Sequence, residues 1–89
     1  MQMKNSDWTI QDNSLKRTFK FKDFKVAFSF MTVVSYLCEE HNHHPDWSNS
    51  YNTVSISLTT HDADSTVTDK DYKLAKAIDK ASSQYEVKE

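Results

Sequence analysis

Residues 14–28 read SLKRTFKFKDFKVAF, and the spacing of the apolar residues changes in the middle of this stretch. Before Asp23 the pattern alternates, which is typical of a strand with one solvated face. After Asp23 apolar residues recur three and four positions apart, which is typical of an amphipathic helix, and Asp23 itself suits the N-cap. We therefore expect a strand over residues 14–22 and a helix over residues 23–41.

The residues expected on the inner face of this strand are Leu15, Arg17, Phe19 and Phe21. The apolar stripe of the helix comprises Phe24, Phe28, Met31 and Cys38, widened by Ala27, Phe30, Val34 and Leu37. Since aromatic residues at helical spacing usually pack inside a domain, we expect the phenylalanines of the helix in the core.

A shorter strand is expected ahead of this pair. In the stretch WTIQ, Trp8 and Ile10 fall on one face of an alternating pattern,. The following Asp12-Asn13 predicts a two-residue hairpin turn. The sequence contains no glycine, so Asn and Asp, which tolerate a left-handed backbone, must form the tight turns.

Pro45 ends the pattern of the long helix, because proline cannot continue a helical hydrogen-bond ladder. After it, WSNSYN (47–52) and TVSISLTTH (53–61) predict two strands around a turn near Tyr51-Asn52,. The side chains of the second strand that are expected in the core are Val54, Ile56 and Leu58. The sequence DADS at residues 62–65 predicts a polar loop.

A final helix is expected to open at TDKD, residues 68–71. Thr68 suits the N-cap, and an acidic Asp71 three positions later comes close to a capping box. Its apolar stripe comprises Leu74, Ala77, Ile78, Ala81 and Tyr85.

The order of elements is therefore β-β-α-β-β-α, an α+β fold. Two hairpins and two amphipathic helices favour a four-stranded antiparallel sheet with both helices packed on one face. The other face would be open to solvent or to another subunit. With 89 residues, we expect a single domain over 1–89, whose modest core oligomerisation would support.

Composition excludes several classes of function. The formal net charge is −2 and the basic residues are scattered, which argues against direct binding of nucleic acid. The absence of glycine excludes P-loop, dinucleotide-binding and GxSxG motifs. No apolar run is long enough to span a membrane, and the single cysteine, Cys38, is expected to be a buried, inert thiol. We expect a cytoplasmic chain.

Three of the four histidines lie in EEHNHHPDW, residues 39–47, and the fourth is His61. If the last two strands form a hairpin, His44 and His61 lie at the same end of the sheet, where Asp71 can also reach. Histidine gives and takes protons near neutral pH, so such a group suits a reaction that needs an acid and a base.

Two alternatives remain for these histidines. His41, His43 and His61 form a conceivable set of metal ligands, although no motif of fixed spacing such as HExxH supports it. The histidines can also be ordinary polar residues at a helix C-terminus, where a protonated imidazole complements the helix dipole. That second account suits His41 better than it suits all four.

EEHNHHPDW, followed by YNTVSISLTTH and TDKDYKLA, resembles the pterin-4a-carbinolamine dehydratase family. The family pattern has an acidic residue, His-His-Pro, an acidic residue and an aromatic one, then a strand ending in Thr-His, then an Asp that opens the last helix. The run FKFKDFKVAFSFM is also similar to the family's strand and long helix. The resemblance covers about residues 8–81.

The resemblance implies elimination of water from 4a-hydroxytetrahydropterin to give quinonoid dihydropterin, as part of tetrahydrobiopterin recycling, with no metal or redox cofactor. It implies that His43, His44 and His61 are catalytic residues that line a pterin pocket, with His43 and His61 transferring protons and His44 mainly positioning the pterin.

The resemblance also implies supporting residues. Glu39, about one turn before His43, would orient an imidazole or bind the amino-pyrimidine edge of the pterin. Asp71 would fix a histidine tautomer or the start of the helix. Trp47 would either wall the flat heterocycle or serve simply in packing. His41 does not match the motif and is expected at the surface.

Relatives of this kind are commonly homodimers or homotetramers. Some animal members also act as dimerisation cofactors of a homeodomain transcription factor, so a protein-binding module is the main rival interpretation. A histidine-rich metal-binding module is a third. A pure binding module has no need of His43, His44 and His61 together, and this chain has all three.

Overall fold

The computed structural model describes residues 7–61 and 66–85, and the predicted loop at 62–65 lies outside them. The elements in chain order are β1 Thr9–Gln11, β2 Ser14–Lys20, α1 Phe24–His41, β3 Asp46–Ser50, β4 Thr53–Leu58 and α2 Asp69–Ser82. This is the predicted β-β-α-β-β-α order.

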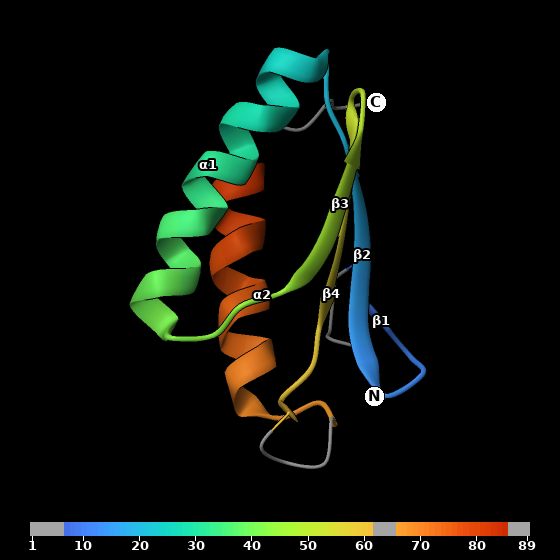
Figure 1. Cartoon of the computed structure of the whole chain (residues 1–89), viewed down its shortest axis with the longest axis vertical. Helices are drawn as coiled ribbons and strands as arrows, with labels where there is room; N and C mark the ends of the chain where they lie inside the picture. Colours follow the sequence, from blue (N-terminus) through green and yellow to red (C-terminus); the bar gives the residue numbers. More distant parts are fainter. Residues whose placement is uncertain (1–6, 62–65, 86–89) are drawn as a thin grey trace.

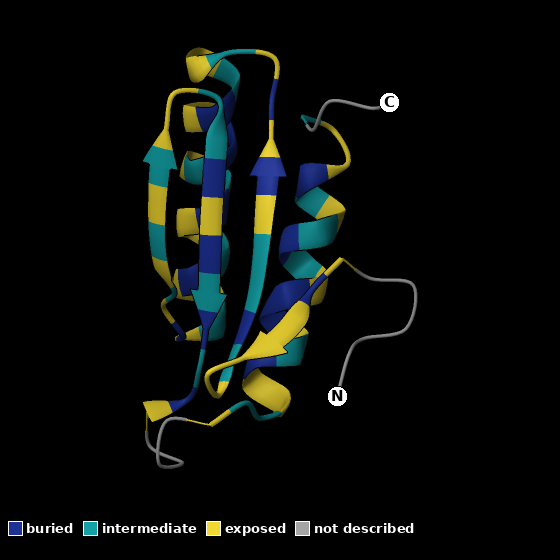
Figure 2. Cartoon of the chain, turned by 90° about the vertical axis from the view of Figure 1, so that its right-hand side faces the viewer, coloured by how far each residue is buried: buried dark blue, intermediate teal, exposed yellow. Residues whose placement is uncertain are grey.

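The four strands form one antiparallel sheet in the order β1-β2-β4-β3. Both helices lie on the same side of this sheet (Figure 1). Buried and more exposed residues alternate along β4 (Figure 2), because one face of the sheet packs on the helices and the other is open,. The predicted α+β fold class is confirmed.

Both predicted hairpin turns are present. Asp12 and Asn13 have φ values of 53° and 62°, and Gln11 pairs with Ser14 on either side of them. In the second hairpin Tyr51 has a φ of 52°. In the first turn Asp and Asn thus take the place that glycine usually fills. In the second turn the left-handed residue is a tyrosine, so the expectation that Asn and Asp form all the tight turns is wrong there.

Helix α1 begins and ends at recognisable caps. The Asp23 carboxylate accepts a hydrogen bond from the Val26 N–H at 2.9 Å. At the other end Asn42 is left-handed, with φ 50°, and the His43 N–H donates to the Cys38 carbonyl at 3.0 Å. The helix therefore ends at Asn42, ahead of Pro45, and this turn directs the next residues away from the helix axis.

The core lies between the sheet and the helices. Its fully or almost fully buried apolar residues are Trp8, Leu15, Phe19, Phe21, Ala27, Phe30, Val34, Cys38, Val54, Ile56, Leu58, Leu74, Ala75 and Ile78. All three β4 residues predicted in the core are among them, as are two of the predicted α2 residues, Leu74 and Ile78. Ala77, Ala81 and Tyr85 are only partly buried.

The prediction that the α1 phenylalanines all lie in the core is wrong for two of them. Phe24 and Phe28 are 49% and 53% exposed, and their rings contact each other at a centroid distance of 5.6 Å. The buried stripe of α1 runs through Ala27, Phe30, Val34 and Cys38. Phe24 and Phe28 are rotated off this stripe and face solvent.

Trp8 and Ile10 also differ in burial, since Trp8 is fully buried and Ile10 is 38% exposed. Strand β1 is short and lies at the edge of the sheet, so the helices do not cover Ile10. Trp8 instead reaches α2, where its Nε1–H donates to Asp79 Oδ1 at 2.7 Å. Arg17 Nη1 donates to the same oxygen at 2.6 Å, so one carboxylate joins α2 to both N-terminal strands.

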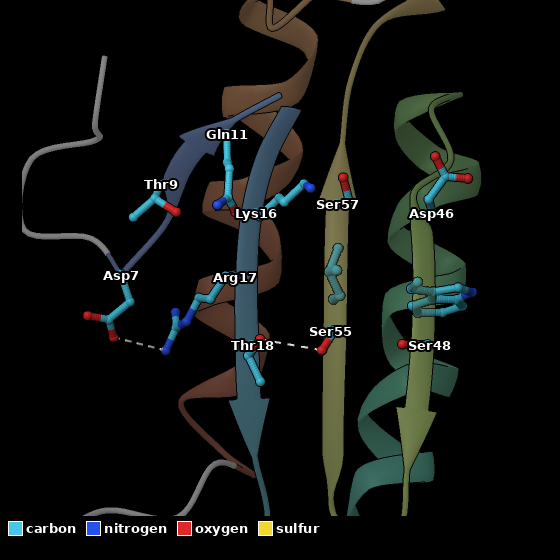
Figure 3. Close-up of a pocket in the computed structure, with 12 residues that line it drawn as sticks. Asp7, Thr9, Gln11, Lys16, Arg17, Thr18, Asp46, Ser48, Ser55 and Ser57 are labelled. Carbon is cyan, nitrogen blue, oxygen red and sulfur yellow. Dashed lines mark hydrogen bonds and ion pairs between the residues drawn. The ribbon is translucent and has the colours of Figure 1, made fainter. Parts of the chain in front are cut away.

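The open face of the sheet carries a polar groove of about 540 Å³. Side chains from all four strands border it, including Lys16, Thr18, Ser55 and Ser57 in the centre (Figure 3). Thr18 Oγ1 and Ser55 Oγ lie 3.3 Å apart across β2 and β4. Within residues 7–61 and 66–85, no helix is long and apolar enough to cross a membrane.

Candidate active site

His43 is buried where the C-terminal end of α1 meets the N-terminal end of α2. The left-handed Asn42 turns the chain so that the imidazole reaches Asp71, and His43 Nε2 lies 2.5 Å from Asp71 Oδ1. Asp71 is fully buried and His43 is 9% exposed. Burial strengthens an electrostatic contact of this kind, because little water competes for either partner.

The second oxygen of Asp71 is also occupied. Asp71 Oδ2 accepts from the Thr68 N–H at 2.9 Å, which closes a capping box at the start of α2. It also accepts from the Thr60 hydroxyl at 2.8 Å. One carboxylate therefore both caps α2 and contacts a histidine, so the predicted position of Asp71 at this end of the sheet is confirmed.

His44 makes a second histidine–carboxylate contact in a different environment. Its Nε2 lies 2.7 Å from Glu39 Oε2, and both side chains are largely exposed, at 62% and 75%. Exposed pairs of this kind contribute little to stability, since water and salt screen them. The contact therefore acts on the orientation of His44 rather than on the stability of the fold.

His61 follows β4 and completes the group. The neighbouring Thr60 donates its N–H to the Thr66 carbonyl at 2.9 Å, and these two residues form a β-bridge. A cavity of about 240 Å³ lies beside it, lined by Asn42, His43, His44, Thr60, His61 and Lys70. The three histidines, distant in sequence, therefore border one cavity.

Trp47 does not line this cavity. It pairs with Ile56 in the sheet and is partly buried against the core. This part of β3 also borders the polar groove on the open face. The sequence interpretation of Trp47 as packing is thus supported by its position, and a pterin-walling role is not.

Three residues that line the cavity were not assigned a role from the sequence: Asn42, Thr60 and Lys70. Thr60 directly precedes His61, and Lys70 directly precedes Asp71, so proximity in sequence to the site residues is the signal that points to them. The sequence did not point to Asn42 as the residue that ends the helix, because Pro45 already accounted for that end.

Cys38 and His41 lie outside the cavity. Cys38 is buried, and burial, with a smaller contribution from the charge of Glu39, raises its pKa to about 11. His41 lies in the last turn of α1 and is half-buried. Among the residues that the structure describes, no three histidine, cysteine or acidic side chains are arranged to hold a metal ion.

Known proteins are similar to this chain in sequence and in fold. The sequence model of the family described as Pterin 4 alpha carbinolamine dehydratase matches residues 1–81. A relative from Prochlorococcus marinus (strain NATL2A), provisionally named a pterin-4-alpha-carbinolamine dehydratase, is 52% identical over 77 residues, which are 86% of this chain and 80% of the relative. A relative from Rhodospirillum rubrum with the same provisional name is 53% identical over 76 residues, 83% of this chain and 78% of its own.

Two solved structures are also similar. The first, described as a transcriptional coactivator/pterin dehydratase from Brucella melitensis, has a TM-score of 0.80 at 39% identity and covers 84% of this chain and 81% of its own. The second is a pterin dehydratase-like protein identified as a RuBisCO assembly factor in the alpha-carboxysome. It has a TM-score of 0.73 at 20% identity over 86% of this chain and 90% of its own, a likeness of fold alone.

The family match spans most of the chain, and the relatives cover more than two thirds of it at about half identity. The resemblance drawn from the histidine motif is thereby confirmed, and this chain belongs to the pterin-4a-carbinolamine dehydratase family.

Proposed function

We propose that this chain is a hydro-lyase that dehydrates 4a-hydroxytetrahydropterin to quinonoid dihydropterin. The observation that carries the proposal is the placement of His43, His44 and His61 around one cavity, with a buried carboxylate on His43. The names given to the relatives favour the same substrate class.

The reaction breaks the bond between C4a and its hydroxyl oxygen and removes a proton from the neighbouring ring nitrogen. Hydroxide is a poor leaving group, so an acid must protonate the oxygen as it departs as water. A base accepts the proton from nitrogen. The two proton transfers balance, and imidazoles serve both roles near neutral pH.

His43 and His61 are the residues that we assign to proton transfer. Because His43 Nε2 contacts Asp71, Nδ1 is the ring nitrogen left to exchange a proton with substrate. His61 also lines the cavity, and it comes from a different part of the chain, just after β4. The split between acid and base follows from which nitrogen lies nearer the C4a oxygen of the bound pterin.

His44 and Glu39 are assigned to binding. Their mutual contact at 2.7 Å holds the imidazole of His44 at the mouth of the cavity, where it positions the pterin. Asp71 supports His43 from behind the cavity wall. The proposal gives no pterin contact to Trp47, since that side chain packs against the core and does not line the cavity.

A stopped-flow assay of carbinolamine decay tests the proposal. Native protein should accelerate the decay over buffer, and His43→Ala and His61→Ala should each reduce kcat at least ~100-fold. His41→Ala is the matched control, because His41 lies in the same segment but outside the cavity, and it should retain native activity. If the carbinolamine decayed no faster with native protein than in buffer, the dehydratase proposal would be refuted.

The rival proposal is a protein-binding role. The description of the Brucella relative as a transcriptional coactivator favours it. An inactive native protein in the stopped-flow assay would favour this rival. A metal-binding module, the third interpretation, predicts that a chelator lowers both activity and melting temperature. The dehydratase proposal predicts that neither changes.

We also propose that the chain is a cytoplasmic homodimer or homotetramer. The exposed ring pair of Phe24 and Phe28 and the sheet-edge strand β3 offer surfaces for a second copy,. Sedimentation velocity at micromolar concentration should give the mass of a dimer or tetramer, and a pure monomer would contradict it. Cell fractionation tests the location.

A further inference from the structure

The Thr60 hydroxyl is buried between two other polar groups. Thr60 is 6% exposed, and its Oγ1 lies 2.8 Å from Asp71 Oδ2 and 2.6 Å from Thr68 Oγ1. Both neighbours belong to the start of α2, whereas Thr60 follows β4. A buried hydroxyl with two partners at these distances has a defined orientation.

The chemistry of the three groups fixes the direction of these hydrogen bonds. An ionised carboxylate only accepts, so the single hydroxyl proton of Thr60 must be donated to Asp71 Oδ2. Towards Thr68, Thr60 Oγ1 can then act only as an acceptor, and the Thr68 hydroxyl is the donor. The chain runs from Thr68 through Thr60 to Asp71, and bonds in such a chain strengthen one another.

This chain determines how Asp71 faces His43. Two donors, the Thr60 hydroxyl and the Thr68 N–H, hold Oδ2, which leaves Oδ1 directed at His43 Nε2. A carboxylate in this position stabilises the tautomer with the proton on Nε2. Nδ1 then carries the lone pair, and this is the nitrogen that the proposed reaction uses.

We propose that Thr60 is a positioning residue for both proton-transferring histidines. Its hydroxyl fixes Asp71 and thereby the tautomer and orientation of His43. Its backbone bridge to Thr66 holds the adjacent His61 at the cavity. The kinetic consequence rests on the proposed function, whereas the effect on the His43 tautomer does not.

Thr60→Val is the variant that tests the hydroxyl, because it is nearly isosteric and leaves the backbone bridge in place. It should lower kcat by about tenfold with KM changed less than about twofold. In a long-range proton–nitrogen NMR spectrum, the His43 ring should lose its uniform Nε2–H pattern and show a mixture of tautomers. Native and variant spectra are compared at one pH, because three other titratable residues border the same cavity: His44, His61 and Lys70.

Two further variants serve as controls. Thr60→Ser restores a hydroxyl and should return kcat to within about twofold of native, together with the native His43 signals. Thr18→Val makes the same chemical change on the open face of the sheet, where the Thr18 hydroxyl contacts Ser55 rather than a residue of the site. It should leave both readouts unchanged.

The proposal is overturned if Thr60→Val keeps native kcat or native His43 signals, or if Thr60→Ser is no better than Thr60→Val. If Thr60→Val does not fold, Thr68→Val interrupts the same chain one hydroxyl further out. It should shift the His43 signals in the same direction, and unchanged signals overturn the proposal. Should native protein show no dehydratase activity, the proposed function fails while the NMR comparison still decides the role of Thr60.

Discussion

His43 Nε2 and Asp71 Oδ1 lie 2.5 Å apart although 28 positions separate the two residues in the chain. The contact forms because each residue is next to a helix cap. Asn42 ends α1 just before His43, and Asp71 closes the capping box that opens α2. The same residues that set the helix boundaries thereby place a histidine against a carboxylate.

Asp71→Asn should reverse the tautomer of His43. The Asn oxygen takes over the donors from Thr60 and Thr68, so the amide N–H₂ turns toward His43 Nε2, which must then accept. The ring proton moves to Nδ1, the nitrogen that the proposed reaction needs unprotonated. We expect kcat to fall at least ~100-fold, with the tautomer change visible by nitrogen NMR.

Asp69→Asn is the matched control for this variant, since Asp69 lies in the same turn of α2 but is exposed. It should keep native kcat and the native His43 tautomer. An Asp71→Asn protein with the Nε2–H tautomer intact would show that the carboxylate does not control the ring.

Glu39→Gln should separate binding from stability. The Glu39–His44 pair is largely exposed, so its loss should change the free energy of unfolding by less than ~1 kcal/mol. If the pair positions the pterin, KM should rise while kcat changes little. Urea unfolding and steady-state kinetics measure the two effects. Glu40→Gln, at the adjacent exposed position, should change neither, and an unaltered KM in Glu39→Gln would remove Glu39 from the binding site.

The fold could be predicted from the sequence because its local signals agree with one another. The alternation ahead of Asp23, the Asp12-Asn13 turn and the Thr68–Asp71 capping box each have a short-range physical cause, and each is found in the structure. Periodicity alone did not separate Phe24 and Phe28 from Phe30. The centre of the buried stripe depends on how α1 is rotated against the sheet, which is a tertiary property.

The site was predictable in part for the same reason. Convergence of His44 and His61 follows from the β3–β4 hairpin, which the sequence predicts. The hydrogen-bond partners of the site residues do not follow from the hairpin. Asp71 contacts His43, and Thr60 donates to Asp71. These contacts depend on the packing of α2 against α1 and β4. Trp47 shows the reverse case, since its motif position favoured the pterin site whereas its strand register directs it toward the core.

Phe30→Ala and Phe28→Ala should differ strongly in stability although both remove the same side chain from α1. Phe30 is fully buried, with its ring centroid 5.0 Å from Phe19 and 4.8 Å from Phe21. Its loss should cost about 3–5 kcal/mol. Phe28 is 53% exposed, and its loss should cost less than ~1 kcal/mol. Urea unfolding of the two variants checks this, and equal losses would contradict the rotation of α1.

Cys38 should make the protein less stable at alkaline pH. Burial raises its pKa from 9.0 to about 11, so between these values the folded chain keeps the thiol proton that the unfolded chain has lost. The folded state then binds more protons than the unfolded one, and the free energy of unfolding falls as the pH rises. The contribution is fully present below pH 9 and is lost as the pH passes about 11.

Cys38→Ala removes this titration, so its free energy of unfolding should fall less steeply than that of native protein over the same pH window. Tyrosines and lysines also titrate in this range, which is why the slopes of the two proteins are compared rather than either alone. The native thiol should react with a thiol reagent far more slowly than in the urea-unfolded chain, because the reactive thiolate is scarce and buried. Equal slopes, or a native thiol that reacts as fast as the unfolded one, would show that Cys38 is accessible in solution.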